Sequence, residues 1–231
     1  MKTAVITGGS GAIGGALVEE FAKDHRVVFT YLNNREKAVS IAERYGAEAI
    51  RCDQTNDLDI KKLLDTINSC DLLINNAGIG SVGLFTDISY QEMHKVVNTD
   101  LLGVMSLTKS VLPLMIREKN GCIINISSIW GVYGGSCEVV YSAAKAGIIG
   151  FTKALSKETG CSGVRVNCIA PGLIESEMNS HLTKGEIDEF VSGTSLGKIG
   201  TAKDVALAAR YLSEAEFVTG QVLGVDGGFW G

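Results

Sequence analysis

The feature that most constrains the fold is a regular alternation of short β-rich runs with segments of helical periodicity. The chain opens with KTAVIT, and helical patterns then begin near Ile13, Arg35 and Leu58, separated by the runs RVVFTY, AEAIRC and DLLIN. Parallel strands need long crossover connections, and a helix between each pair supplies them. The first third of the sequence therefore predicts an α/β fold in which helices cover both faces of a parallel sheet.

The rest of the chain continues the same alternation. An apolar-periodic helix over about residues 89 to 117 precedes the strand CIINIS, a helix carrying Tyr141, the strand VRVNCIA, a more polar segment, a helix from about Ala202, and the run QVLGVDGG. No fixed-period repeat or low-complexity linker divides the 231 residues, of which 45% are hydrophobic. We predict one domain over residues 1–231, with a Rossmann-type doubly wound parallel sheet.

Charge and hydropathy exclude several classes of partner and location. The net charge of −5 offers no basic surface for nucleic acid or for an acidic membrane. The N-terminal MKTAVITGG leads directly into a strand and a glycine turn, and no apolar run approaches the roughly 20 residues of a membrane span. We expect a cytoplasmic protein that binds neither nucleic acid nor a membrane.

The cysteines and histidines show no metal-ligand spacing. The six cysteines, at positions 52, 70, 122, 137, 161 and 168, form no CxxC or Cys/His pattern. The three histidines, at positions 25, 94 and 181, are scattered along the chain. We expect reduced thiols and no metal site. Cys52, Cys122 and Cys168 fall in or beside apolar runs and are expected to be buried, whereas Cys137 lies in the loop before Tyr141, where it could line a substrate pocket.

The first turn of the alternation, TGGSGAIG, runs from Thr7 to Gly14, after a strand and at the start of a helix. Glycines at such a turn let backbone amides approach a pyrophosphate, and the helix N-terminus favours an anion. The alternative is a plain tight turn without a ligand. The strand-turn-helix context favours dinucleotide binding.

The end of the second strand suggests which dinucleotide is bound. A fold that selects NAD usually offers a carboxylate there to the ribose 2′-hydroxyl, but the segment Thr30 to Arg35 reads TYLNNR. Arg35 could instead pair with a 2′-phosphate through its guanidinium fork. We expect NADP(H) as the cofactor. The alternative is that Arg35 only opens the next helix and faces solvent.

The stretch from Ser128 to Lys145, SIWGVYGGSCEVVYSAAK, carries the candidate chemistry. Tyr141 and Lys145 are four residues apart, so on a helix their side chains share one face. A neighbouring cation favours the phenolate, which would lower the pKa of Tyr141 and make it a general acid near neutral pH. Ser128 could hold the same substrate oxygen without ionising. The alternative is that Tyr141 and Lys145 form an ordinary solvated pair.

Four motifs in register resemble the short-chain dehydrogenase/reductase family over essentially the whole chain: TGGSGAIG, Asn75-Asn76-Ala77-Gly78, Ser128 with Tyr141-x-x-x-Lys145, and Pro171-Gly172-Leu173-Ile174. The resemblance implies a Ser128, Tyr141 and Lys145 catalytic set and a homotetramer built by the long helix and the Tyr141 helix. It implies cofactor contacts from Gly8, Ser10, Gly11, Ile13, Gly14, Asn33, Asn34, Arg35, Asp53, Asn75, Ala77, Gly78, Tyr141, Lys145, Pro171, Gly172, Ile174 and Ser176.

One catalytic position departs from the pattern of the family. The motif that reads NLxG in relatives is Asp100-Leu101-Leu102-Gly103, so an aspartate occupies the slot of the catalytic asparagine. If that residue serves a proton relay through its main-chain carbonyl, Asp100 keeps the geometry. If its carboxylate lies near Lys145, it alters the local charge balance. Asn98 points to a different face of the helix and is not expected to substitute.

The substrate is suggested by two levels of resemblance. Overall, the chain resembles 3-oxoacyl-acyl-carrier-protein reductases, but ISSIWGVYGGSCEVVYSAAKAG is more similar to a subgroup that reduces the 5-aminopentanone group on a lysine of elongation factor P. Glu138, with Glu175 and Glu177, would give the pocket an acidic rim that suits an ammonium-bearing ketone. We expect a protein-borne ketone contacted by Ser128, Glu138 and Tyr141. The alternatives are a 3-oxoacyl-acyl-carrier-protein reductase and a non-catalytic NADP-binding redox sensor.

Overall fold

The computed structural model describes residues 1–176, 179 and 182–230 and contains one sheet of seven strands. Every neighbouring pair in the sheet is parallel, in the order β3-β2-β1-β4-β5-β6-β7. The strands are β1 (Lys2–Ile6), β2 (His25–Tyr31), β3 (Glu48–Arg51), β4 (Leu72–Asn75), β5 (Gly121–Ile126), β6 (Val164–Pro171) and β7 (Val222–Val225). The predicted doubly wound parallel sheet is confirmed.

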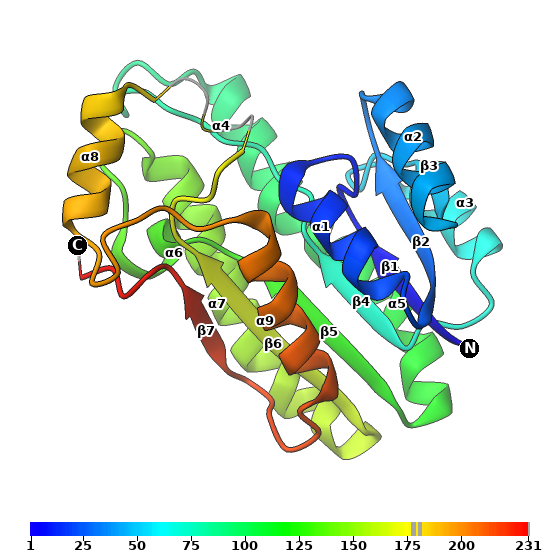
Figure 1. Ribbon diagram of the computed structural model, residues 1–231. Helices are drawn as coiled ribbons and strands as arrows, with labels where there is room; N and C mark the ends of the chain where they lie inside the picture. Colours follow the sequence, from blue (N-terminus) through cyan, green and yellow to red (C-terminus); the bar gives the residue numbers. More distant parts are fainter. Residues whose placement is uncertain (177–178, 180–181, 231) are drawn as a thin grey trace.

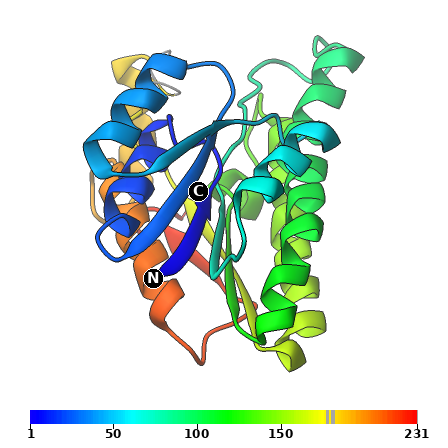
Figure 2. The ribbon, with the colours of Figure 1, turned by 90° about the vertical axis from the view of Figure 1, so that its right-hand side faces the viewer.

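Helices connect successive strands. They are α1 (Ala12–Phe21), α2 (Arg35–Tyr45), α3 (Asp57–Thr66), α4 (Tyr90–Val97), α5 (Val104–Glu118), α6 (Ile129–Tyr133), α7 (Val139–Thr159), α8 (Lys184–Ser192) and α9 (Ala202–Glu214). Figures 1 and 2 show the sheet between two helical layers, with α1, α2 and α9 on one face and α3, α5 and α7 on the other. Within β1, Ala4 and Ile6 face the first layer and Val5 faces the second, as a strand buried on both faces requires.

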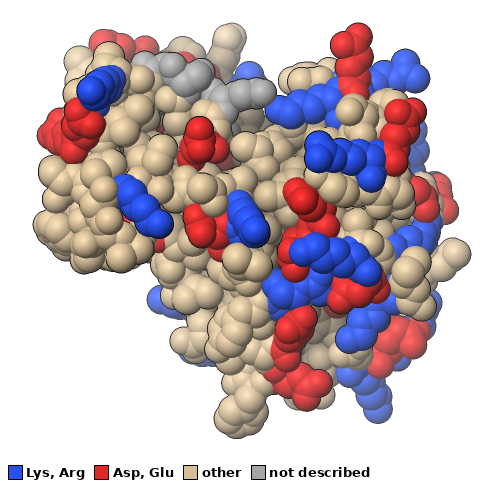
Figure 3. All heavy atoms as spheres, viewed as in Figure 1, with Lys and Arg blue, Asp and Glu red and all other residues tan. Residues whose placement is uncertain are grey.

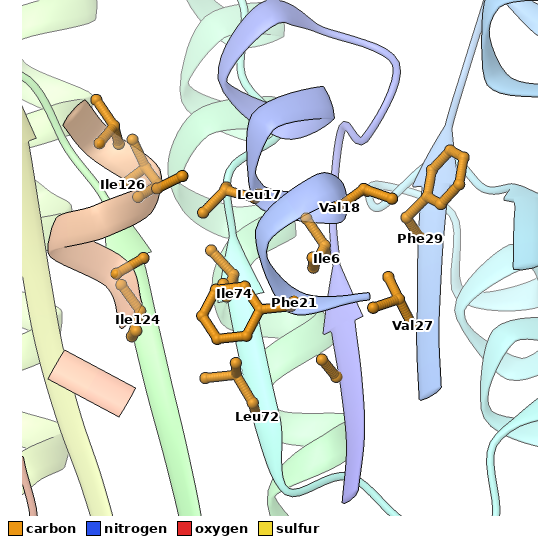
Figure 4. Packing of buried hydrophobic residues seen from close by; sticks show 14 of the residues in the cluster. Ile6, Leu17, Val18, Phe21, Val27, Phe29, Leu72, Ile74, Ile124 and Ile126 are labelled. Carbon is orange, nitrogen blue, oxygen red and sulfur yellow. The ribbon is translucent and has the colours of Figure 1, made fainter. Parts of the chain in front are cut away.

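Helix α1 shows how sequence periodicity builds the core. Leu17, Val18 and Phe21 lie on one side of the helix and are completely buried. Figure 4 shows these three side chains directed at the strands, where they pack in one cluster with Ile6 and Ile74. Burying each such side chain stabilises the fold by about 1.5–3 kcal/mol relative to leaving it exposed. This packing holds α1 against the sheet.

The long helix predicted over residues 89 to 117 extends over Tyr90–Glu118 but contains one π-helical turn at Asn98–Gly103. By length and composition it could cross a membrane, which corrects our expectation that no apolar segment is that long. Its buried residues Leu107, Val111 and Met115 pack in the core with the sheet, so it belongs to the helical layer of the fold. A π turn is frequently found at a functional site.

Two helices were not predicted, although local capping signals specify both. The side chain of Ser128 accepts a hydrogen bond from the backbone N–H of Trp130 and so starts α6. Thr183 and Glu186 form a reciprocal capping box that starts α8 within the polar segment. These two short helices lie at the carboxyl edge of the sheet, together with the ends of all seven strands (Figure 1). In open parallel sheets, ligands bind at this edge, where the strand order reverses between β1 and β4.

Candidate active site

The glycine turn after β1 has the form of an anion-binding site. Gly8 has a φ of +69°, which favours glycine, and a Cβ on Gly14 would lie 2.0 Å from the Gly8 carbonyl oxygen. Gly11 is exposed and precedes α1 without a side-chain cap, and no acidic residue lies in the first turn. Ser10 lies within the turn, and Ile13 packs partly into the core. The N-terminus of α1 therefore offers backbone donors that fit a pyrophosphate.

Thr7 joins this turn to the Asn75-to-Gly78 turn, a role that was not predicted from the sequence. Its hydroxyl oxygen accepts hydrogen bonds from the backbone N–H groups of Asn76 and Ala77, both at 2.9 Å. The Asn76 side chain donates to the Thr7 carbonyl at 2.9 Å. These bonds hold Ala77 and Gly78 beside the glycine turn, as expected for two parts of one binding site.

Asn75 belongs to a buried polar chain rather than to an open surface. Its Nδ2 donates to Asn125 Oδ1 at 2.8 Å and to Thr108 Oγ1 at 3.0 Å. Asn125 Nδ2 in turn donates to Thr152 Oγ1 at 2.9 Å. The Asn75 side chain therefore ties β4 to β5 and to α5. Asn75 would support the cofactor site by fixing these elements.

The ends of β2 and β3 carry exposed cations. Asn34 caps α2 by accepting a hydrogen bond from the Lys37 N–H, and Arg35 is the first, exposed residue of that helix, with its N–H bonded to the Asn33 carbonyl. Arg51, the register partner of Tyr31, is also exposed. This second arginine was not predicted, since only strand pairing brings it to the end of β2.

The turn after β3 reaches the π turn of the long helix. The Asp53 carboxylate accepts hydrogen bonds from the N–H and hydroxyl of Thr55, so it shapes this turn. The neighbouring Gln54 is buried, and its Nε2 donates to the Thr99 carbonyl at 2.8 Å. Gln54 was not predicted, and it fixes the helix segment that contains Asp100.

The turn after β6 lies on the opposite side of the site. The Gly172 N–H donates to the Val225 carbonyl, and a Cβ on Gly172 would lie 2.9 Å from Asp226 Cα. Ile174, which follows Pro171 at the end of β6, is 3% exposed, so only its backbone can meet a cofactor. Ser176 is partly exposed and Glu175 is exposed. Glu177, predicted for the acidic rim, lies outside the described residues, as does His181.

The three catalytic candidates meet at the start of α7. Lys145 Nζ lies 5.5 Å from the centroid of the Tyr141 ring, one helical turn away, and donates to the Ile126 carbonyl at 3.3 Å. The Ser128 side chain lies close enough to Tyr141 to lower its pKa. Ser127, another residue not predicted, donates to the Lys145 carbonyl at 2.8 Å and so holds β5 against α7. Tyr141, Ser128 and Lys145 therefore face one another, as expected.

Asp100 joins this group through its side chain. Its Oδ2 lies 3.2 Å from Lys145 Nζ, with both side chains at most 5% exposed, and its Oδ1 accepts a hydrogen bond from the Ile79 N–H at 2.8 Å. Gly78 covers the pair, since a Cβ there would lie 2.7 Å from Asp100 Oδ2. Asn98, by contrast, is exposed, so it does not share the buried position of Asp100.

Our expectation for the pKa of Tyr141 is wrong. Burial raises that pKa most strongly, Lys145 lowers it, and Asp100 raises it again. The outcome is a pKa above the usual value of a tyrosine, so the phenol is protonated at neutral pH. Burial is the strongest single effect on the pKa of Lys145 and lowers it, but Asp100 and Tyr141 together outweigh burial, and the pKa is raised. The site thus contains a neutral phenol beside a compensated ammonium.

Aromatic side chains from three segments form one side of the site. Trp130, two residues after Ser128, packs edge-on against Phe190 of α8 and against Phe229, with ring centroids 6.3 and 5.9 Å apart. Phe190 and Phe229 stack at 4.9 Å, and the Tyr133 hydroxyl donates to the Phe229 carbonyl. No local pattern in the sequence signals this cluster, because its members come together only in the fold. It fixes α8 and the C-terminal segment to the serine loop.

The remaining polar groups are less specific. Glu138 is the partly exposed residue before α7, and its charge raises the pKa of Tyr141.

Within the described part of the chain, no three His, Cys, Asp or Glu side chains cluster as metal ligands would. Burial raises the pKa values of Cys52, Cys122 and Cys168 to about 11. Figure 3 shows Lys and Arg mixed with Asp and Glu across one face of the molecule.

This arrangement suits one type of chemistry. A protonated phenol, a serine hydroxyl and a buried ammonium converge next to a turn that fits a pyrophosphate. Such a group can hold a carbonyl oxygen and give it a proton.

Comparison with known proteins covers the whole site. A family profile described as short chain dehydrogenase matches residues 2–187. The chain is 39% identical to a protein named 3-oxoacyl-[acyl-carrier-protein] reductase FabG from Chlamydia trachomatis, with 98% of this chain and 96% of the relative aligned. It is 34% identical to a protein of the same name from Thermotoga maritima (98% and 97%) and 35% identical to an uncharacterized oxidoreductase, YmfI, from Bacillus subtilis (99% and 98%).

Proposed function

The chain belongs to the short-chain dehydrogenase family of oxidoreductases, and from this premise we propose that it is an NADPH-dependent reductase that converts a ketone into a secondary alcohol. The observation that carries the proposal is the convergence of Ser128, Tyr141 and Lys145 at the carboxyl edge of the sheet, beside an uncapped helix N-terminus. When bound, the cofactor supplies a hydride to the carbonyl carbon.

The protein's own residues complete the reduction. As the carbonyl carbon gains the hydride, its oxygen takes the electron pair of the C=O bond and needs a proton. The Tyr141 hydroxyl donates that proton, and the raised pKa of Tyr141 keeps the donor form populated at neutral pH. Ser128 holds the same oxygen by a hydrogen bond, and Lys145 stabilises the phenolate that remains.

The cofactor preference is proposed from the basic end of β2. Exposed Arg35 opens α2, and exposed Arg51 ends the neighbouring strand. Both are available to a 2′-phosphate, which supports NADPH over NADH. The pyrophosphate would lie at the glycine turn formed by Gly8, Gly11 and Gly14.

The first substrate class that we propose is a 3-oxoacyl thioester. Its support is the name of the relatives, which are 3-oxoacyl-[acyl-carrier-protein] reductases aligned over nearly their whole length. The second class is a ketone that carries an ammonium group, such as 5-aminopentanone on a lysine of elongation factor P. Its support is Glu138, which lies close enough to Tyr141 to affect its pKa.

One set of assays tests the reaction and separates the substrates. NADPH oxidation at 340 nm should be measured with a 3-oxoacyl thioester, with an amino-ketone and with the neutral isostere of the amino-ketone. Turnover of the thioester with equal kcat/KM for the two ketones supports the acyl substrate. A higher kcat/KM for the amino-ketone, reduced by Glu138→Gln and by salt, supports the second class. The absence of turnover with every ketone would support a non-catalytic redox sensor.

We also propose that the protein assembles as a homotetramer through α5 and α7. Exposed apolar side chains lie on both helices, Met105 and Ile116 on α5 and Val139 on α7, and Leu102 lies in the π turn that precedes α5. An exposed apolar patch on a helical layer is typical of an interface. Light scattering after size exclusion checks the assembly, and a monomeric mass would reject it.

A further inference from the structure

The Asp100–Lys145 ion pair is an unusual arrangement for a proton-transfer site. Asp100 Oδ2 is completely buried and accepts no hydrogen bond from a described residue; its partner is ionic, the Lys145 ammonium at 3.2 Å. Oδ1 is separately engaged by the Ile79 N–H. The carboxylate is thus fixed at both oxygens, one by the backbone and one by the charge of Lys145.

These contacts require a carboxylate at position 100, because the atom that faces the Lys145 ammonium must be a negatively charged oxygen. Asparagine has nearly the same shape, and its amide oxygen could still accept from Ile79. Its amide nitrogen would then face Lys145 Nζ, and two donors cannot bond to each other. Since Gly78 leaves no room for another side chain above the pair, no described neighbour could replace the missing negative charge.

The charges around Tyr141 come from several elements. Lys145 lies on the same helix, Asp100 on the π turn of the long helix, and Glu138 at the start of α7; Cys168 of β6 also faces Lys145. Of these charges only the Lys145 ammonium favours the phenolate. Asp100 lies against that ammonium and cancels much of its effect.

We propose that Asp100 is a positioning residue that, by neutralising Lys145, keeps Tyr141 a proton donor into the alkaline range. The proposal rests on the function proposed above, in which Tyr141 is the general acid. With asparagine at this position the ammonium would act on Tyr141 without compensation, and the proton of the Tyr141–Lys145 pair would be lost at lower pH. Asp100 thereby sets the upper pH limit of ketone reduction.

The direct test is the titration of Tyr141 in the protein without substrate or cofactor. Tyrosine labelled with 13C at Cζ reports ionisation by NMR, and Tyr141→Phe identifies the Tyr141 resonance among the six tyrosines. We expect Asp100→Asn to lower the Tyr141 midpoint by about one pH unit or more. Glu118→Gln is the matched control, because it removes an equal charge from an exposed position at the end of α5. An unchanged midpoint in Asp100→Asn overturns the proposal.

A second variant covers the case in which Asp100→Asn folds poorly because the buried Lys145 ammonium then keeps only the Ile126 carbonyl and has no negatively charged partner. Asp100→Asn/Lys145→Met removes both charges and should return the Tyr141 midpoint to near that of the wild type. A midpoint in the double variant that lies about one pH unit or more below that of the wild type would show that Asp100 acts by another route than Lys145, and would reject the proposal.

The pH profile of kcat/KM for reduction, which reports the pKa values of the substrate-free enzyme, completes the test. Its alkaline limb should move to lower pH in Asp100→Asn by the same interval as the NMR midpoint. If the midpoint shifts but no ketone is reduced, the proposed function fails while the charge coupling stands. If ketones are reduced and neither the midpoint nor the limb moves, the inference about Asp100 fails and the function stands.

Discussion

The Lys145 ammonium lies 5.5 Å from the centroid of the Tyr141 ring, one turn further along α7. Burial keeps the phenol protonated at neutral pH, and Lys145 places a cation where a phenolate would form. Replacing Tyr141 by Phe removes the proton donor and preserves the ring. We expect kcat to fall by about 10²–10⁴-fold, with NADPH affinity, measured by fluorescence titration, nearly unchanged. Near-normal turnover would contradict the assignment of Tyr141.

Arg35 provides a test of cofactor choice. Arg35→Ala should weaken NADPH binding by about ten-fold or more, because a charge-assisted pair contributes roughly 1.5–3 kcal/mol, and should leave NADH binding nearly unchanged. Arg44→Ala, in the last turn of the same helix, is the control. The dissociation constants of both cofactors should be measured for each variant. Equal losses for NADPH and NADH would show that Arg35 does not contact a 2′-phosphate.

Two adjacent glycines in α1 should respond differently to the same change. A Cβ on Gly14 would lie 2.0 Å from the Gly8 carbonyl oxygen, so Gly14→Ala must move the turn and should abolish measurable NADPH binding. At Gly15 the nearest atom would be Ile41 Cδ1 at 3.6 Å, an ordinary contact. Gly15→Ala should bind NADPH normally and gain up to about 1 kcal/mol in stability. Comparable affinities for the two variants would rule out a tight turn at Gly14.

The buried polar chain through Asn125 should contribute to stability. Asn125→Ala leaves Asn75 Nδ2 without one acceptor and Thr152 Oγ1 without its donor. Each unsatisfied group costs about 1–3 kcal/mol, so the free energy of unfolding in urea should fall by about 2–6 kcal/mol. Asn68→Ala, at an exposed position, should stay within about 0.5 kcal/mol of the wild type. A loss of similar size in both variants would contradict the prediction.

The cysteines should separate into two reactivity classes. Cys137 and Cys161 are partly or fully exposed and should react with a thiol reagent at pH 8, whereas Cys52, Cys122 and Cys168 are buried with pKa values of about 11. Mass spectrometry of the labelled native protein checks this pattern. Because the folded state retains these protons above their usual pKa of 9.0, the stability that they contribute should fall as pH rises from about 9 to 11. Rapid labelling of Cys168 would show that its strand opens.

The alternation of strand and helix patterns was sufficient to predict the sheet. The proximity of Tyr141 and Lys145 could be predicted as well, because residues four positions apart share one face of a helix. The edge location of the glycine turn and of the turn after β4 follows from parallel strands. These features depend on local patterns, which a single sequence contains.

Features that depend on tertiary packing could not be predicted in this way. The raised pKa of Tyr141 reflects its burial and the direction of the Asp100 side chain, which a π turn determines. The aromatic contact between Trp130 and Phe229 joins residues 99 positions apart. The sequence suggested that Asp100 could lie near Lys145, but only the fold shows that its carboxylate does.

The π turn at Asn98–Gly103 also sets the number of residues that the long helix must contain. Val96 and Val104 flank Asp100 and are both buried, although eight residues of regular α-helix advance about 80° beyond two full turns. A turn closed by i→i+5 bonds takes up the extra residue and returns the three side chains to one side. Removing a residue here would rotate α5 by about 100° relative to α4 and take its apolar side off the sheet. Gaps that separate related chains should therefore fall in the loops around this helix, and length variation within it should be selected against.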